Sequence, residues 1–402
     1  MYVNVFTHRC GAIVIYIWLL YHVIMRNSVK AFLNLAAYRL FEVVAHTDKQ
    51  AYYMRTSTPS RRAHQTLPCL WLLVYCLLLH GCAQPDIGAE IRDNYESSLS
   101  ELPLSERQHF SLRMYRITGD ARYLPAIRAD ARRDAKALSR DIAQLADPGY
   151  RLARATDIVR RYPDDTEKSR LRKALLARSG EIAFAKSLLY DVYQADDLGV
   201  VGQPPVSDIS MAMDYLRQVD WAGFWLAPGT LRIYAAQSAN QIYYLYHLGL
   251  VDLRRQLKRA FRDAFPDAID AQLSELEYEN KIYGLTHFII AHTDYYQHFV
   301  QRRQFDWIYA YFETNLEQIL RRTKADIYAE VALCFLLAGE RKHPVVTRIK
   351  RELEARYDAQ AEMIPADDNG TDLEHGEHRN TMVIMLYDWP KRLHKGPAIE
   401  WQ

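Results

Sequence analysis

Three apolar helical patterns in this chain stop at a glycine, and a second helical pattern follows each stop at once. The glycines are Gly119, Gly249 and Gly339, and apolar residues recur three and four positions apart before them. Glycine suits the left-handed position that ends a helix, and so tight a stop folds the next helix back against the first. The glycines lie 130 and 90 residues apart, near multiples of roughly 45 residues, the length of one helical hairpin. The sequence therefore predicts antiparallel helical hairpins.

The same periodicity runs through the rest of the chain beyond its first 90 residues. Strands are at most incidental, because no alternating apolar and polar runs are joined by a hairpin turn. The sequence predicts an all-α domain over residues 91–394 and a short tail over 395–402. The expected helices span residues 91–99, 105–118, 121–145, 150–161, 165–195, 207–218, 230–248, 251–263, 275–302, 305–321, 324–338, 343–357 and 376–388.

A secretory signal is predicted over residues 54–81. Arg61 and Arg62 precede an apolar run over 67–79, and this order is the pattern of a signal peptide. The segment Leu79–Cys82 resembles the lipobox of bacterial lipoproteins, whose cysteine is lipidated and becomes the first mature residue. A plain signal peptide or a short membrane anchor is the alternative.

The lipobox resemblance implies a location as well as a modification. Lipidated Cys82 and a tether over 82–90 would anchor the protein to a membrane on the periplasmic face of the bacterial cell envelope. Ala83 after the cysteine resembles the pattern for transfer to the outer membrane. Because a signal peptide should begin the chain, we expect translation to start at Met54 and residues 1–53 to be an upstream extension. The alternative is an extra membrane helix within 1–53.

Charge and motifs exclude several classes of function. Residues 82–402 carry 43 Lys and Arg against 47 Asp and Glu, so a nucleic-acid partner is not expected. A nucleotide is not expected either, because no phosphate-binding glycine loop is present, and the sequence predicts no cofactor. Cys334 is the single cysteine beyond Cys82, which excludes a disulfide framework and a zinc site built from several thiolates. The sequence predicts no metal site.

Glu330 is the strongest candidate for a functional residue. It interrupts an apolar helix, and none of the residues three or four positions away is basic. A buried carboxylate needs a partner, so the partner must come from another helix. His287 and His378 are expected to face Glu330 because both lie at polar breaks in apolar helices. An arginine that neutralises Glu330 inside the packing is the alternative, and both interpretations stay open.

Two further candidates depend on helix geometry. On a continuous helix over 275–302, His287 and Asp294 share a face. Two interpretations of this face stay open: it lines a cavity, or it is exposed to solvent. Asn380 opens the last helix after a long loop, where polar residues serve as caps or as site residues. The candidate catalytic residues are thus Glu330, His287, His378, Asp294 and Asn380. Asp326 is expected to cap a helix together with Thr323.

The hairpin arrangement and the phrase over Tyr115–Leu124 resemble the α/α-toroid proteins, which include six-hairpin glycosidases, uronyl hydrolases and several polysaccharide lyases. The resemblance implies hairpins arranged in a toroid with a site at its axis; a helical repeat solenoid is the structural alternative. Hydrolases of this class use paired carboxylates, and lyases use tyrosine, histidine, asparagine and arginine. The phrases over 283–296, 326–340 and 377–389 are also similar to an uncharacterised proteobacterial lipoprotein family, which implies no activity.

Two functions of different classes follow from these patterns. The first is a carbohydrate-active hydrolase or lyase that acts on a saccharide at the toroid axis. The second is a non-enzymatic envelope scaffold that binds a protein or a peptidoglycan component. Convergence of Glu330, His287 and His378 on one open site would favour the enzyme, and scattered, separately paired side chains would favour the scaffold.

Overall fold

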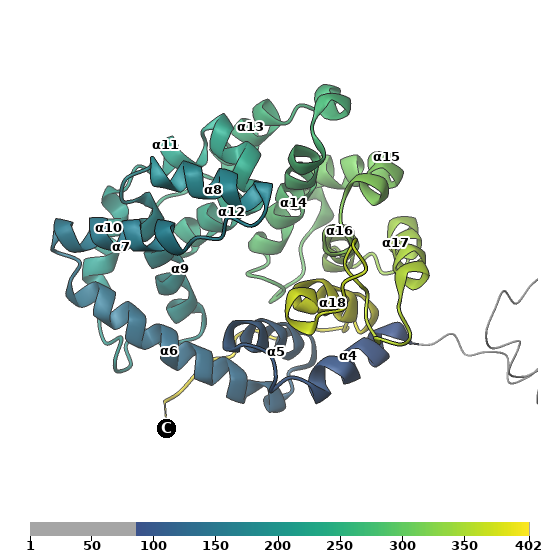
Figure 1. Ribbon diagram of the computed structural model, residues 1–402, viewed down its shortest axis with the longest axis horizontal. Helices are drawn as coiled ribbons and strands as arrows, with labels where there is room; N and C mark the ends of the chain where they lie inside the picture. Colours follow the sequence, from purple (N-terminus) through teal and green to yellow (C-terminus); the bar gives the residue numbers. More distant parts are fainter. Residues whose placement is uncertain (1–85, 402) are drawn as a thin grey trace, which may run out of the picture. The chain divides into compact units, whose positions relative to one another are not determined.

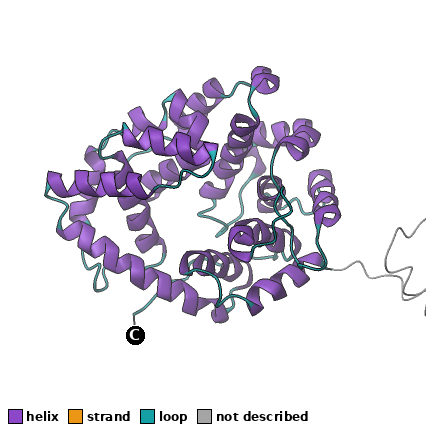
Figure 2. Cartoon of the chain, in the orientation of Figure 1, coloured by secondary structure: helices purple, strands orange, loops and turns teal. Residues whose placement is uncertain are grey.

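The structure, a computed structural model, describes residues 86–401. These residues form helices and loops without a strand (Figure 2), apart from two isolated bridges at Gln203–Val206 and Asp358–Met363, so the all-α prediction is confirmed. The segment predicted as a signal peptide, Cys82 and residues 1–53 lie outside the described part of the chain. No helix within residues 86–401 is long and apolar enough to cross a membrane.

The α-helices are α4 (Ile87–Ser97), α5 (Leu104–Thr118), α6 (Leu124–Ala143), α7 (Pro148–Arg161), α8 (Glu167–Ala177), α9 (Ile182–Asp197), α10 (Ser210–Gln218), α11 (Trp221–Trp225), α12 (Pro228–His247), α13 (Arg254–Ala264), α14 (Glu275–His292), α15 (Asp306–Arg322), α16 (Ala325–Leu337), α17 (Pro344–Arg356) and α18 (Leu373–Tyr387). Short 3₁₀ turns lie at Ala121–Tyr123, Asp267–Gln272 and Arg302–Gln304.

The predicted glycine stops end helices in the structure. Gly119, Gly249 and Gly339 have φ angles of 71°, 64° and 81°, a left-handed conformation that glycine adopts without the steric penalty of a Cβ atom. Each stop joins two helices that pack together, namely α5 with α6, α12 with α13, and α16 with α17. The glycines therefore make the helical hairpins that the sequence predicted.

The inner helices contact one another in a cyclic order. Helix α9 packs on α12, α12 on α14, α14 on α16, α16 on α18, and α18 on α5, while α6 contacts both α5 and α9 (Figure 1). The remaining hairpin partners pack on the outside: α13 on α12, α15 on α14, α17 on α16 and α4 on α18. Side chains from sequence-distant helices, such as α5 and α18, are thereby brought to the same inner surface.

Two long helices expected from periodicity are interrupted. The helix expected over 165–195 is two helices, α8 and α9, because the chain turns at Gly180 with a φ of 57°. The helix expected over 275–302 ends at His292, and Asp294, Tyr295 and Tyr296 follow with φ angles of 48°, 57° and 74°. We call Asp294–Tyr296 the left-handed turn. It places Asp294 off the helical face that carries His287, which corrects the expectation of a shared face.

The folded domain is longer at both ends than the expected 91–394. Helix α4 begins at Ile87, whose side chain is buried. The first helix therefore starts within residues 82–90, the segment that was expected to be a tether. Near the other end, Ile399 is buried and its N–H donates to the carbonyl oxygen of Leu198 at 2.7 Å. The C-terminal segment is thus packed against the end of α9.

Candidate functional site

Glu330 lies on α16, and its carboxylate meets groups from two other helices. Thr286 Oγ1 donates a hydrogen bond to Glu330 Oε2 at 2.7 Å. His287 Nε2 lies 3.6 Å from the same oxygen, and His378 Nε2 lies 3.5 Å from Oε1. The Glu330 side chain is 2% exposed. The structure therefore brings together the three residues that the sequence singled out as a convergent group.

The arginines considered as alternative partners lie elsewhere. Arg232 pairs with Glu277 at 3.5 Å, and Arg379 Nε donates to the carbonyl oxygen of Ile364 at 2.9 Å. No arginine or lysine within residues 86–401 lies within 4.0 Å of the Glu330 carboxylate. The ionisable partners of this buried carboxylate are thus two imidazoles.

The two imidazoles are held close to Glu330 but are under-bonded. Within the described residues, neither His287 Nε2 nor His378 Nε2 makes a hydrogen bond, although both atoms are buried. His287 Nδ1 lies 2.7 Å from Asn240 Oδ1, which fixes the ring orientation. Buried polar atoms without partners are uncommon, and a catalytic role or a bound water or ion is among their explanations.

Burial and charge pull the pKa values of this group in opposite directions. Burial alone raises the pKa of Glu330, but the histidines outweigh it and lower this pKa to about 2. Burial lowers the pKa of His378, yet the ionised Glu330 carboxylate raises it above its usual value. Glu330 is therefore ionised near neutral pH, and it favours a proton on His378.

A second histidine–carboxylate pair lies beside the first. His109 Nδ1, from α5, lies 2.9 Å from both carboxylate oxygens of Glu377, and Thr381 Oγ1 donates to the same carboxylate at 2.7 Å. The rings of His109 and His378 are 5.2 Å apart. Burial lowers the pKa of His109, with Glu377 opposing this shift only in part. Two neighbouring imidazoles thus have pKa values that move apart.

Both pairs have a partly exposed edge that is poorly hydrated. The His378 side chain is 36% exposed and that of His109 is 25% exposed, yet loss of hydration is the largest influence on the pKa of each. Tyr283, whose ring is 4.5 Å from that of His287, also loses hydration, which raises its pKa. We call the surface formed by His109, Tyr283 and His378 the recess.

Arg113 and two tyrosines of the left-handed turn lie close to the recess. The Arg113 guanidinium carbon is 5.4 Å from the ring centroids of both Tyr295 and Tyr296. The charge of Arg113 also acts on the pKa values of His109 and Tyr283. A left-handed backbone over three non-glycine residues costs conformational energy, and here it sets the position of two aromatic rings beside the site.

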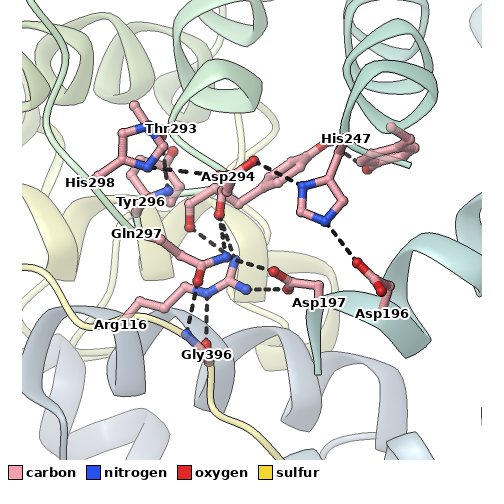
Figure 3. Close-up of polar contacts among 12 residues, drawn as sticks. Arg116, Asp196, Asp197, His247, Thr293, Asp294, Tyr296, Gln297, His298 and Gly396 are labelled. Carbon is pink, nitrogen blue, oxygen red and sulfur yellow. Dashed lines mark hydrogen bonds and ion pairs between the residues drawn. The ribbon is translucent and has the colours of Figure 1, made fainter. Parts of the chain in front are cut away.

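Arg116 holds this left-handed turn in place (Figure 3). Its side chain is almost completely buried, and Nη1 donates to the carbonyl oxygens of Asp294 and Tyr295 at 3.2 and 3.0 Å. Nη2 donates to Asp197 Oδ2 at 2.5 Å, and Nε donates to the carbonyl oxygen of Gly396 at 3.2 Å. Arg116 therefore links α5, the end of α9, the turn and the C-terminal segment. We call this group the Arg116 cluster.

We call the group formed by Glu330, Thr286, His287 and His378 the Glu330 site. Asp294 belongs to the Arg116 cluster and not to the Glu330 site. Its carboxylate lies 3.6 Å from His247 Nδ1 and 3.8 Å from His298 Nδ1 (Figure 3). His247 also meets Asp196 at 2.9 Å, and hydrogen bonds to the two carboxylates raise the pKa of His247 to about 10. The structure thus separates Asp294 from the other candidate residues.

Asn380 also lies apart from the recess, and it anchors the loop before α18. Its Oδ1 accepts a hydrogen bond from the N–H of Ile364 at 2.7 Å, and its Nδ2 donates to the carbonyl oxygens of Gly376 and Ile364 at 3.0 and 3.2 Å. The side chain is fully buried. Asn380 therefore fixes the start of the helix that carries His378, without reaching the recess itself.

The expected capping box at α16 is absent. Lys324 is the N-cap, and Thr323 Oγ1 donates backward to the carbonyl oxygen of Ile319 at 2.8 Å. Asp326 is consequently not engaged in capping, and it stays half-buried, close enough to act on the pKa values of His378 and Tyr283. Thr323 ends α15, and its hydroxyl is already used by the carbonyl oxygen four residues earlier, so it does not cap α16.

Metal-binding groups do not gather in the described part of the chain. Residues 86–401 contain no set of three or more histidine, cysteine, aspartate or glutamate side chains placed to hold a metal ion. Cys334 lies one turn beyond Glu330, with its Sγ 3.8 Å from the carbonyl oxygen of Thr286, and burial raises the pKa of its thiol. A buried thiol with a raised pKa is a poor nucleophile.

Sequence comparison places the chain in a family. No curated protein and no solved structure is detectably similar to it. A family model described as "Domain of unknown function (DUF3541)" matches residues 85–402, a range that begins two residues before α4 and includes both histidine–carboxylate pairs. Because the match covers most of the chain, this protein belongs to the DUF3541 family, whose domain is of unknown function.

Proposed function

We propose that the domain is a carbohydrate-active enzyme that uses histidine acid–base chemistry in the recess. The observation that carries the proposal is the pair of neighbouring imidazoles, His109 and His378, with pKa values shifted in opposite directions. Groups whose environments separate their pKa values supply an acid and a base at one pH. The cyclic contact order of α5, α6, α9, α12, α14, α16 and α18 supports an α/α toroid.

The two imidazoles take different roles. His378, with its raised pKa, is the proton donor; its Nε2 is buried against Glu330, so the exposed part of the ring contains Nδ1. His109 donates through Nδ1 to Glu377, which leaves Nε2 to accept a proton. Glu330 and Glu377 are positioning residues, because they orient the imidazoles and set their pKa values without reaching the substrate themselves.

Burial of the carboxylates favours a lyase over a hydrolase. A hydrolase with two carboxyl groups needs both of them at the sugar, but the side chains of Glu330 and Glu377 are 2% and 4% exposed. In an elimination, His109 removes a proton from the carbon next to an electron-withdrawing group of the sugar. The neighbouring C–O bond breaks, a C=C bond forms, and the leaving oxygen takes the proton of His378. No water is consumed.

The test is a panel of polysaccharides incubated with the full-length protein. We expect new chain ends that carry a C=C bond, detected by ultraviolet absorbance, and a loss of turnover of at least about a hundredfold in His378→Gln. His375→Gln is the matched control, because His375 lies on the same helix but is exposed and contacts Asp372. New reducing ends without unsaturation would indicate hydrolysis. Equal turnover in both variants would contradict the catalytic role of His378, and no cleavage of any polysaccharide would favour the binding scaffold.

We further propose that the protein is an envelope lipoprotein anchored at Cys82 on the periplasmic face, with the outer membrane as its destination. The support is the order of basic residues, apolar run and Leu79–Cys82 segment. A Cys82→Ala variant should stay unprocessed or be released from the membrane fraction. Unchanged mass and unchanged membrane partitioning in that variant would contradict lipidation.

A further inference from the structure

Lys168, Arg172 and Lys186 form a group of cations on α8 and α9, and one of them lies at the recess. Lys168 Nζ is 5.5 Å from the ring centroid of Tyr283, the tyrosine that contacts His287. Arg172 follows one helical turn later, and its charge acts on Lys168, Tyr283 and Lys186 alike. Figure 1 shows α9 facing α16 and α18 across the middle of the ring of helices. Lys186 therefore lies on the helix opposite those that carry Glu330 and His378, whereas Lys168 and Arg172 lie on α8, with Lys168 beside Tyr283.

None of the three cations has a carboxylate partner within the described residues. Lys168, Arg172 and Lys186 all lie beyond 4.0 Å from every carboxylate oxygen of residues 86–401. Arg172 donates only to neutral acceptors, the carbonyl oxygen of Ile233 at 3.3 Å and Gln237 Oε1 at 3.0 Å. Elsewhere in the domain a buried lysine is paired: Lys281 Nζ meets two aspartates at 2.8 and 2.6 Å.

The unpaired lysines are also removed from water. Both are half-buried, and burial lowers the pKa of Lys168 and of Lys186 to about 8. Arg113, beside the recess, likewise keeps a buried Nε without a hydrogen-bond partner among the described residues. A cation that loses hydration without gaining a counter-ion destabilises the folded state. Such groups are retained where a ligand of opposite charge completes the site.

The carboxylates around these cations are largely neutralised. Glu330 is held by Thr286 and two imidazoles. Glu279 lies 4.0 Å from Lys324, and burial raises its pKa. Burial raises the pKa of Asp191 to about 7, so part of it is uncharged at neutral pH. Asp326 remains as the carboxylate near the recess without an ion pair among the described residues, against several unpaired cations.

We propose that the recess binds an acidic saccharide, whose anionic group lies against Lys168, Arg172 and Lys186 while the sugar ring reaches His378. This inference rests on the site assigned in the proposed function, and it adds the charge of the substrate. The anionic group is a carboxylate, a sulfate or a phosphate, because a guanidinium and two ammonium groups can bind each of them. Tyr283, next to Lys168, offers an aromatic face for the sugar ring.

Binding to the full-length protein tests this inference directly. The probes are oligosaccharides of equal length that carry carboxylates, sulfates or phosphates, and a neutral oligosaccharide is the reference. We expect one acidic probe to bind at least about tenfold more tightly than the neutral one. Which acidic probe binds identifies the anionic group. Equal affinity for acidic and neutral probes, or no binding of any acidic probe, overturns the inference.

Two lysine variants locate the anion. Lys186→Met and Lys168→Met should each weaken acidic-probe binding by about tenfold, the usual effect of losing one charge-assisted contact. Lys173→Met is the matched control, because Lys173 lies on α8 too but pairs with Asp164 at 2.8 Å. A loss in the control equal to that in the recess variants overturns the inference. Turnover is measured separately in His378→Gln, so unchanged turnover in that variant with intact binding of the acidic probe contradicts the proposed function alone.

Unliganded stability gives a readout that needs no probe. Because Lys186 is unpaired and poorly hydrated, Lys186→Met should raise the midpoint of thermal unfolding. Lys281→Met should lower this midpoint, because the substitution leaves the buried carboxylate of Asp270 without its lysine partner. A fall in Lys186→Met as large as that in Lys281→Met would show a structural ion pair and overturn the inference.

Discussion

Arg116 and Glu330 are equally buried, but the Arg116 cluster and the Glu330 site differ in how their polar atoms are used. Arg116 and Glu330 are each 1% exposed. Arg116 donates to a carboxylate and to three carbonyl oxygens. Glu330 receives one hydrogen bond, from Thr286, and faces two imidazole nitrogens that make none. Complete satisfaction is typical of structural polar groups, and incomplete satisfaction is typical of groups kept for a ligand or a reaction.

The difference also extends to what each group connects. The Arg116 cluster ties together the ends of segments: α5, α9, the left-handed turn and the C-terminal segment. The Glu330 site joins the middles of α14 and α16 to the start of α18, and His378 there touches solvent. One cluster therefore fixes the backbone, whereas the other presents titratable side chains to the recess.

The largest effect is expected from Arg116→Met. This change leaves Asp197 and three carbonyl oxygens without their buried donor, which costs about 3–5 kcal/mol of stability. Urea unfolding followed by circular dichroism measures the loss. Arg303→Met, at an exposed position, should change stability by less than about 0.5 kcal/mol. An Arg116→Met protein as stable as this control would refute a structural role for the cluster.

A smaller loss with a defined pH window is expected from Glu330→Gln. The pKa of Glu330 is lowered from its usual 4.5 to about 2, so ionised Glu330 stabilises the fold above pH 4.5, and this contribution disappears as pH falls towards 2. We expect Glu330→Gln to cost about 1–3 kcal/mol at pH 7, the range for a hydrogen-bonded charged group. Urea unfolding at several pH values should show the difference from the parent narrowing below pH 4.5. A difference independent of pH contradicts this account.

The contrast between the clusters also explains what the sequence could predict. Periodicity and the glycine stops at Gly119, Gly249 and Gly339 are local signals, and the all-α fold followed from them. Glu330 stood out because an apolar helix with no basic neighbour leaves a carboxylate unpartnered. The left-handed turn could not be predicted, because it depends on Arg116, 178 residues away from Asp294.

His109 was missed for a similar reason. Its partner Glu377 lies 268 residues away in the chain, and a single histidine in an amphipathic helix carries no signal of that pairing. Asn380 and Asp294 were placed among the candidates because polar residues near a loop or on a helical face can serve either structure or function. The structure assigns both of them hydrogen bonds or ion pairs outside the recess.

Glycine variants give the smallest expected effects and report on the surroundings of Arg116. Gly119 and Gly249 both have positive φ, so alanine at either position costs about 1 kcal/mol in backbone strain. A Cβ atom at Gly119 would also lie 2.5 Å from the ring of His394. A Cβ atom at Gly249 would have no neighbouring atom within 4 Å. Because the N–H of His394 donates to the Arg116 carbonyl oxygen, Gly119→Ala should be the more destabilising. Equal losses in urea unfolding would show that the His394 ring moves freely.

The separated pKa values of His109 and His378 are the central claim, and nuclear magnetic resonance titration of their ring protons tests it without a substrate. In the parent protein, His378 should titrate above pH 6.5 and His109 below it, because Glu330 raises one pKa and burial lowers the other. In Glu330→Gln, the pKa of His378 should fall below 6.5 while that of His109 stays nearly unchanged. Two histidines that titrate together near pH 6.5, or a His378 pKa unaffected by Glu330→Gln, would contradict the account.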